Sequence, residues 1–233
     1  VEISHYEIIK DINWYTRRGG ENIDLVHRWL PSWAQMTSVS TPHLAEEWWT
    51  NFSAPSTYVS GSTLSVPEPL STSQTLVLSG EQYIREVLEQ ARKVRTVAER
   101  HLGGPAKEAT FVISPSWKRT MAQAALSFIE EGGHPKQFIS VLRDMPFLEG
   151  ERQGEIIGFW GKKMLPQVFK WDDASKAMVS SEMNESEVLE AAKEFIAAEL
   201  QLQTVNVVVG ESDGDVTGRA NSAMPLSPAV VYA

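Results

Sequence analysis

Helical periodicity is the sequence feature that most constrains the fold of this chain. Along four segments the apolar residues recur every three to four positions, which places them on one face of an α-helix. These segments are residues 1–18, 22–39, 81–102 and 185–200. Three short runs are instead rich in β-branched residues, as strands are, and they cover residues 109–113, 204–209 and 228–232. The sequence therefore predicts a mostly helical α+β fold with one small sheet of about three strands.

A stretch without sustained periodicity divides the chain into two parts. Residues 51–79 are crowded with Ser, Thr and Pro, which indicates loop and linker. We place the boundary near residue 78, so that residues 1–78 form a helical first domain and residues 79–233 a helix-rich second domain. In the first domain Pro31 interrupts the second predicted helix, where we expect a kink or a break.

The second domain has helix boundaries that local residues mark. We expect its longest helix to begin at Glu81 with Ser79 as the N-cap and to end at Gly103-Gly104. Asn184 is the predicted N-cap of the last helix. The elements between these two helices and the strands are a helix that Gly132-Gly133 ends, helices at 135–142 and 149–170, and a polar connection at 172–183.

Composition excludes several classes of function. The net charge of −9 argues against a general polyanion binder, so any contact with nucleic acid must use a local basic patch. The chain has no cysteine, which removes disulfides and thiolate zinc sites and favours a cytoplasmic location. It has no run of 18 apolar residues, so we expect no membrane contact. Because no initiator Met is present, we expect a fragment of a longer protein.

Candidate catalytic and metal sites are weak in this sequence. The histidines at 5, 27, 43, 101 and 134 have no spacing that places two on one helix face, so we expect no metal site. The acidic Glu211, Asp213 and Asp215 are better explained by a tight turn than by a cation loop. We interpret His101-Leu-Gly-Gly104 as a helix stop. We therefore expect neither a catalytic residue nor a bound cofactor.

Basic residues in clusters are the candidate contacts to RNA, because they neutralise phosphates. These candidates are Arg17, Arg18, Arg92, Lys93, Arg95, Lys118, Arg119, Lys162, Lys163 and Arg219. A solvated helix face is the alternative explanation for each pair. Lys118-Arg119 follows a strand and opens a helix, where backbone N–H groups also favour phosphate. Trp117 beside them is suited to stack on an unpaired base.

Four motifs together resemble one family. Trp14-Tyr15-Thr-Arg17-Arg18 is followed by Pro42-His43-x-Ala45-Glu46-Glu47-x-Trp49. The strand ending near Ile113 leads into Pro115-x-Trp117-Lys118, and the chain closes with Arg219-Ala-Asn-Ser-Ala223-x-Pro225-x-x-Pro228. This order of motifs resembles the C-terminal region of leucyl-tRNA synthetases of the archaeal and eukaryotic cytosolic type, which belong to class Ia.

The resemblance implies a function and a set of partners. Such an enzyme attaches leucine to its tRNA, using ATP and magnesium in a catalytic domain whose signature motifs this chain lacks. Residues 1–78 would be a truncated helical anticodon-binding bundle, and residues 79–233 a domain that meets the long variable arm, with Arg219 as a reader of that arm. We expect leucine tRNA and the catalytic and editing domains of the same polypeptide as partners, and a monomer.

Two alternatives remain open from the sequence. Valyl and isoleucyl enzymes carry a related Pro-His-x-x-Glu-Glu-x-Trp block, so the chain could be the equivalent region of one of them, although its tail argues against this. It could instead be an acidic helical protein-interaction module whose Trp-rich segment, Trp29 to Trp49, is an exposed docking face. The salt dependence of binding separates RNA recognition from protein docking, because phosphate contacts weaken steeply with salt and apolar docking does not.

Overall fold

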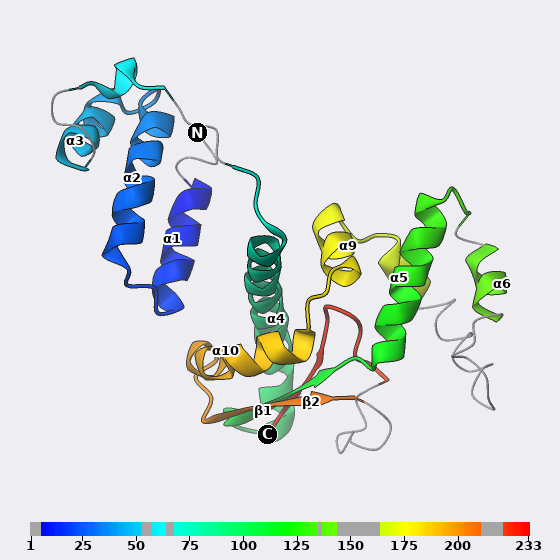
Figure 1. Cartoon of the computed structure of the whole chain (residues 1–233). Coiled ribbons are helices and arrows are strands. Elements are labelled where there is room, and N and C mark those ends of the chain that lie inside the picture. Colours follow the sequence, from blue (N-terminus) through cyan, green and yellow to red (C-terminus); the bar gives the residue numbers. More distant parts are fainter. Residues whose placement is uncertain (1–5, 53–56, 64–67, 135–136, 144–163, 211–220) are drawn as a thin grey trace. The chain divides into compact units, whose positions relative to one another are not determined.

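The computed structural model describes residues 6–52, 57–63, 68–134, 137–143, 164–210 and 221–233 (Figure 1). The chain splits into two compact units, Val1–Pro69 and Leu70–Ala233. The observed division thus falls nine residues before the expected boundary at residue 78. Helices dominate both units, and the three strands all belong to the second, so the predicted α+β class is confirmed.

The first unit consists of short helices around a small apolar core. Its elements are α1 (Ile8–Arg17), α2 (Ile23–Thr37), α3 (Pro42–Phe52) and the 3₁₀ helix η2 (Val59–Gly61). Asn22 begins α2 by accepting a hydrogen bond from Leu25 N–H. The helix continues through Pro31, which excludes the break that was one of the two expectations there, and the kink stays a prediction. The core of the first unit is formed by Ala34, Ala45, Trp49 and Val59.

In the second unit, the long helix α4 (Thr72–Leu102) begins nine residues before the predicted start at Glu81, which is about two and a half turns. Ser71 and Gln74 form a reciprocal capping box at its N-terminus, so the predicted Ser79 cap is wrong. Gly80 lies inside the helix, where an added Cβ would come within 3.5 Å of Val188. At the other end Gly103 adopts a left-handed φ of 70°, which confirms the predicted helix stop.

A mixed three-stranded sheet forms the base of the second unit. Its strands are β1 (Glu108–Ile113), β2 (Thr204–Val209) and β3 (Ala229–Tyr232), in the order β2-β1-β3. β1 runs parallel to β2 with Ile113 opposite Val209, and it runs antiparallel to β3 with Ala109 opposite Tyr232. The predicted strands are therefore confirmed, and the carboxyl ends of β1 and β2 lie at the same edge.

The remaining helices are α5 (Ser116–Glu130), α6 (Phe138–Arg143), α8 (Leu165–Val168), α9 (Asp173–Ser180) and α10 (Glu185–Glu199). Of these, α10 packs on β2, whereas α8 and α9 pack on α5. Asn184 accepts hydrogen bonds from the first turn of α10, as predicted. The predicted polar connection at 172–183 is wrong, because it contains α9, whose Met178 and Val179 are buried. Most of the predicted helix at 149–170 lies outside the described residues.

Candidate nucleic-acid interface and pocket

The C-terminal end of α1 carries the first pair of predicted RNA contacts. The Arg17 guanidinium carbon lies 5.5 Å from the centroid of the Trp14 ring, in a cation–π arrangement, and the residue is exposed. Arg18, the next residue, is half-buried and its N–H group donates to Trp14 O. Cations at a helix C-terminus are favoured by the helix dipole. This pair therefore places positive charge at one end of the first unit's α1.

The basic cluster of α4 divides into solvent-facing and internal members. Lys93 is exposed and forms no ion pair with any described residue. Arg92 is exposed as well, and its Nη2 lies 2.6 Å from Glu199 of α10. Arg95 points inward, where it pairs with Glu99 at 2.6 Å and donates to Leu200 O at the C-terminus of α10. Arg92 and Lys93 are thus the members available to a large ligand.

Lys118 lies in the interior of the second unit and not on its surface. Only 1% of the residue is exposed, and its Nζ donates to Ala223 O at 2.6 Å and to Asn221 O at 3.0 Å. Burial lowers the pKa of Lys118 to about 8. The Trp117 ring lies 5.7 Å from the ammonium and is itself half-buried. The geometry gives Lys118 a structural role, because it anchors the segment that precedes β3.

Arg119 also stabilises the fold, because it donates hydrogen bonds to carbonyl groups at the C-terminal end of helix α9. Its Nη2 donates to Met178 O at 2.8 Å and to Ser181 O at 2.9 Å, and its Nε donates to Val179 O at 3.2 Å. Carbonyl groups at a helix C-terminus have no partners within the helix, so the half-buried guanidinium satisfies them well. Gln123, one turn along α5, donates to the same Val179 carbonyl.

Glu185 in the first turn of α10 is the partner of Arg119. Its carboxylate lies 3.5 Å from Arg119 Nη1 and accepts from Leu226 N–H at 3.1 Å, and 4% of the residue is exposed. Burial raises the pKa of Glu185, while Tyr83, Arg119 and the Leu226 N–H group oppose that rise. Burial, and then the Glu185 charge, raise the pKa of Tyr83. The Tyr83 hydroxyl interacts with this carboxylate without meeting the geometry of a hydrogen bond.

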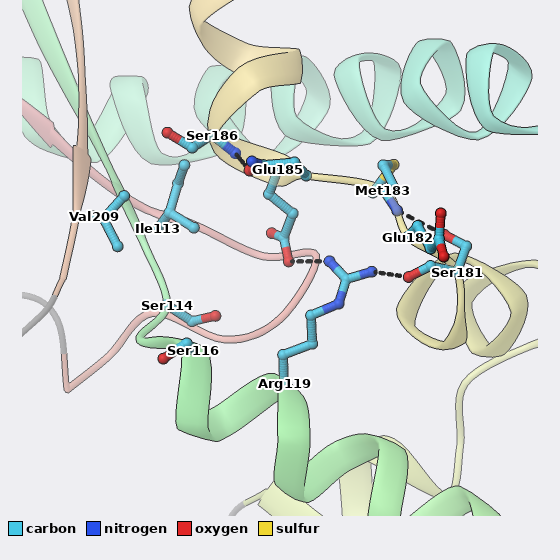
Figure 2. A pocket seen from close by; sticks show the side chains of 11 residues that line it. Ile113, Ser114, Ser116, Arg119, Ser181, Glu182, Met183, Glu185, Ser186 and Val209 are labelled. Carbon is cyan, nitrogen blue, oxygen red and sulfur yellow. Dashed lines mark hydrogen bonds and ion pairs between the residues drawn. The ribbon is translucent and has the colours of Figure 1, made fainter. Parts of the chain in front are cut away.

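A pocket of about 310 Å³ adjoins this ion pair (Figure 2). Ile113 and Val209, at the carboxyl ends of β1 and β2, form one side. Ser114 and Ser116, before and at the start of α5, and residues 181–186, before and at the start of α10, form the others. The carboxyl edge of parallel strands is a common position for ligand sites, because the connections to the helices open a crevice there.

The structure brings few of the predicted contacts together. Arg92 and Lys93 are neighbours on α4, whereas Arg95, Lys118 and Arg119 are each engaged with different internal partners. Lys162, Lys163 and Arg219 lie outside the described residues.

Sequence reasoning missed Ser114 and Glu185, which line the pocket, and Tyr83, which interacts with Glu185. Glu185 follows the predicted cap Asn184, and an acidic residue in the first turn of a helix is ordinary. Nothing in the sequence around Glu185 indicates that its side chain is buried. For Ser114, the signal was its position directly after a strand that runs into a helix, where side chains meet the carboxyl edge of the sheet.

The tryptophans of the first unit do not form an exposed docking face. Trp29, Trp33 and Trp48 are half-buried, and the rings of Trp33 and Trp48 stack with their centroids 4.3 Å apart. Trp49 is buried and its indole N–H donates to Thr57 Oγ1 at 2.9 Å. These rings pack mainly on one another, which disfavours the protein-interaction alternative.

Neither a cluster of metal ligands nor a membrane-spanning helix is present among the described residues. No group of three or more His, Asp or Glu side chains in this part of the chain could hold a metal ion. Within the same residues, none of the helices is both long and apolar enough to cross a membrane.

Comparison with known proteins finds leucine–tRNA ligases of several archaea among the relatives of this chain. The chain is 29% identical over 230 residues to a leucine–tRNA ligase of Methanococcus maripaludis, which aligns 99% of this chain with 22% of that protein. It is 26% identical over 225 residues to the leucine–tRNA ligase of Methanocaldococcus jannaschii, covering 97% of this chain and 21% of that protein. For the Pyrococcus horikoshii enzyme the identity is 24% over 237 residues, 99% of this chain and 22% of the relative. No protein-family model matches the chain.

Proposed function

We infer that this chain, a homologue of the archaeal leucine–tRNA ligases, is the tRNA-recognition portion of such an enzyme. The observation that carries this proposal is the similarity over 97–99% of the chain to several of these ligases, whose length it spans to only 21–22%. This coverage is expected if the chain corresponds to one portion of a larger enzyme. The stacking of the half-buried Trp33 and Trp48 and the burial of Trp49 disfavour the protein-interaction alternative.

Among the described residues, the proposal assigns to RNA the exposed Arg17, Arg92 and Lys93 and the half-buried Arg18. Arg17 with Arg18 on the first unit and Arg92 with Lys93 on the second would contact phosphates. Arg95, Lys118 and Arg119 are occupied inside the fold and would support those surfaces indirectly. Lys162, Lys163 and Arg219 remain predicted contacts, and Arg219 remains the proposed reader of the variable arm. Because the net charge is −9, such local groups must supply the attraction.

The parent enzyme would join leucine to its tRNA with ATP and magnesium held outside this chain. The catalytic and editing domains of the same polypeptide would be its partners, and the protein would act as a cytoplasmic monomer. Leucine tRNA has the long variable arm that we propose as the ligand of the second unit. Recognition of its shape and backbone would dominate over base contacts, as is general for folded RNA.

A binding titration tests the proposal directly. The chain would be titrated with leucine tRNA, with leucine tRNA whose variable arm is shortened, and with isoleucine tRNA, each at roughly 50 and 200 mM salt. We expect the intact leucine tRNA to bind most tightly. If three phosphates are contacted, its affinity should fall on the order of 40-fold between the two salt concentrations.

The two other tRNAs are the controls for specificity. Equal affinity for all three would contradict recognition of the variable arm by this chain. Affinity that does not change with salt would contradict phosphate contacts and would revive the protein-interaction alternative.

A further inference from the structure

We propose that the pocket at the carboxyl ends of β1 and β2 binds one unpaired nucleobase, an inference that rests on the proposed function. None of the basic residues assigned to phosphate is needed for this site. It would add a base contact to the backbone contacts made elsewhere on the second unit.

The walls of the pocket suit a flat and partly apolar group. Ile113, Met183 and Val209 contribute apolar side chains; Figure 2 shows Ile113 and Val209 together on the strand side and Met183 on the other side of the Arg119–Glu185 pair. The volume of about 310 Å³ is at the lower end of the roughly 300–1,000 Å³ found for ligand pockets. Proteins that take a base out of a stack enclose it between apolar or aromatic side chains in this manner.

A hydroxyl inside the pocket is available to a polar group of a ligand. Ser114 is 6% exposed, and its hydroxyl forms no hydrogen bond with any described residue. Figure 2 shows this side chain directed into the space that Arg119 and Glu185 border. This hydroxyl is not among the enclosed polar atoms that lack a partner, so it stays accessible from the pocket and can donate to or accept from a ligand there. The edges of every nucleobase offer such groups.

The charges around the pocket favour a neutral ligand over a phosphate. Arg119 is the basic residue of the lining, and its nitrogens already donate to three carbonyl groups and approach Glu185. The Glu182 and Glu185 carboxylates line the same space and would repel an anion. A nucleobase carries no charge, so it escapes this repulsion and keeps the apolar contacts.

A nuclear magnetic resonance titration of the whole chain tests the site itself. Adenosine, cytidine, guanosine and uridine would be added separately, with inorganic phosphate as the alternative ligand. We expect at least one nucleoside to shift the amide signals of Ser114, Met183 and Val209 in a saturable way, and phosphate to leave them unchanged. Shifts with phosphate alone, or with none of the five, would overturn the proposal.

Two variants connect the pocket with RNA binding. Val209→Trp should fill the pocket from its partly exposed edge and weaken binding of leucine tRNA by roughly tenfold, as expected when one enclosed base loses its apolar contacts. Ser114→Ala should weaken it severalfold. The matched controls are Val141→Trp on α6, which is 36% exposed against 40% for Val209, and Ser127→Ala on the exposed side of α5. Neither control should change the affinity.

The outcomes separate this inference from the function on which it rests. If the unmodified chain binds leucine tRNA and Val209→Trp binds equally well, the base pocket is rejected and the proposed function stands. If the unmodified chain binds none of the tRNAs, both are rejected. Loss of binding in Val209→Trp with retained binding in Val141→Trp supports the pocket.

Discussion

The Arg119 guanidinium lies 3.5 Å from the Glu185 carboxylate, and this ion pair joins the first turns of α5 and α10. The same guanidinium holds the end of α9, while the same carboxylate holds the Leu226 N–H group before β3. Four segments that are distant in sequence therefore depend on one pair of side chains. This pair also forms part of the pocket wall, so the fold and the proposed base site share residues.

Arg119→Ala should destabilise the second unit strongly. Removing the guanidinium leaves the Glu185 carboxylate buried without its counter-ion and leaves the α9 carbonyls unsatisfied, which costs about 3–5 kcal/mol in comparable cases. Urea unfolding of the whole chain measures the change. Arg92→Ala is the control, because its pair with Glu199 is more exposed and should contribute about 1 kcal/mol or less. Similar losses in both variants would contradict the central role of the buried pair.

Lys118 should make stability depend on pH in the alkaline range. Its pKa is lowered from 10.5 to about 8 in the folded protein, so between these values the unfolded chain binds the proton and the folded chain does not. Stability from this group therefore rises as pH increases from about 8 to 10. The difference in unfolding free energy between the natural chain and Lys118→Met should increase over this interval. A constant difference at pH 8, 9 and 10 would show that Lys118 is not desolvated.

Tyr232→Phe should loosen the contact between β3 and α4. The Tyr232 hydroxyl is buried and donates to Ala91 O at 2.8 Å, and burial raises the pKa of Tyr232 to about 12. Loss of this hydrogen bond should lower the free energy of unfolding by about 1 kcal/mol. Chemical denaturation checks this value, with Tyr58→Phe as the control, since Tyr58 is 74% exposed. An unchanged midpoint in Tyr232→Phe would mean that the hydroxyl contributes nothing.

Lys93→Ala should weaken RNA binding without affecting the fold. Lys93 is exposed and has no ion-pair partner among the described residues, so its only expected loss is a phosphate contact. The slope of log affinity against log salt should become less steep by about 0.9 for that contact. Fluorescence anisotropy with labelled leucine tRNA measures the slope. Lys193→Ala, on α10, removes a lysine that pairs with Glu190 and should leave the slope unchanged.

Local chemistry made most of the helix and strand positions predictable. Asn184 begins α10 and Gly103 ends α4, because a cap and a left-handed residue act on the backbone beside them. β-branched runs likewise marked all three strands. The start of α4 was misplaced although Ser71 and Gln74 carried a capping box, because the Ser- and Thr-rich residues after it have no clear apolar period. α9 was missed because its eight residues are too few to show one.

The sequence by itself determined the class of fold, the order of its elements and the family resemblance, since these depend on local propensity and on motifs that are contiguous in the chain. The roles of the charged residues were decided by tertiary structure. Lys118 and Arg119 looked like surface cations, yet parallel pairing of β1 with β2 brings the starts of α5 and α10 together and encloses both side chains. Burial, pKa and the pocket at Ser114 arise from that long-range contact, which no local pattern encodes.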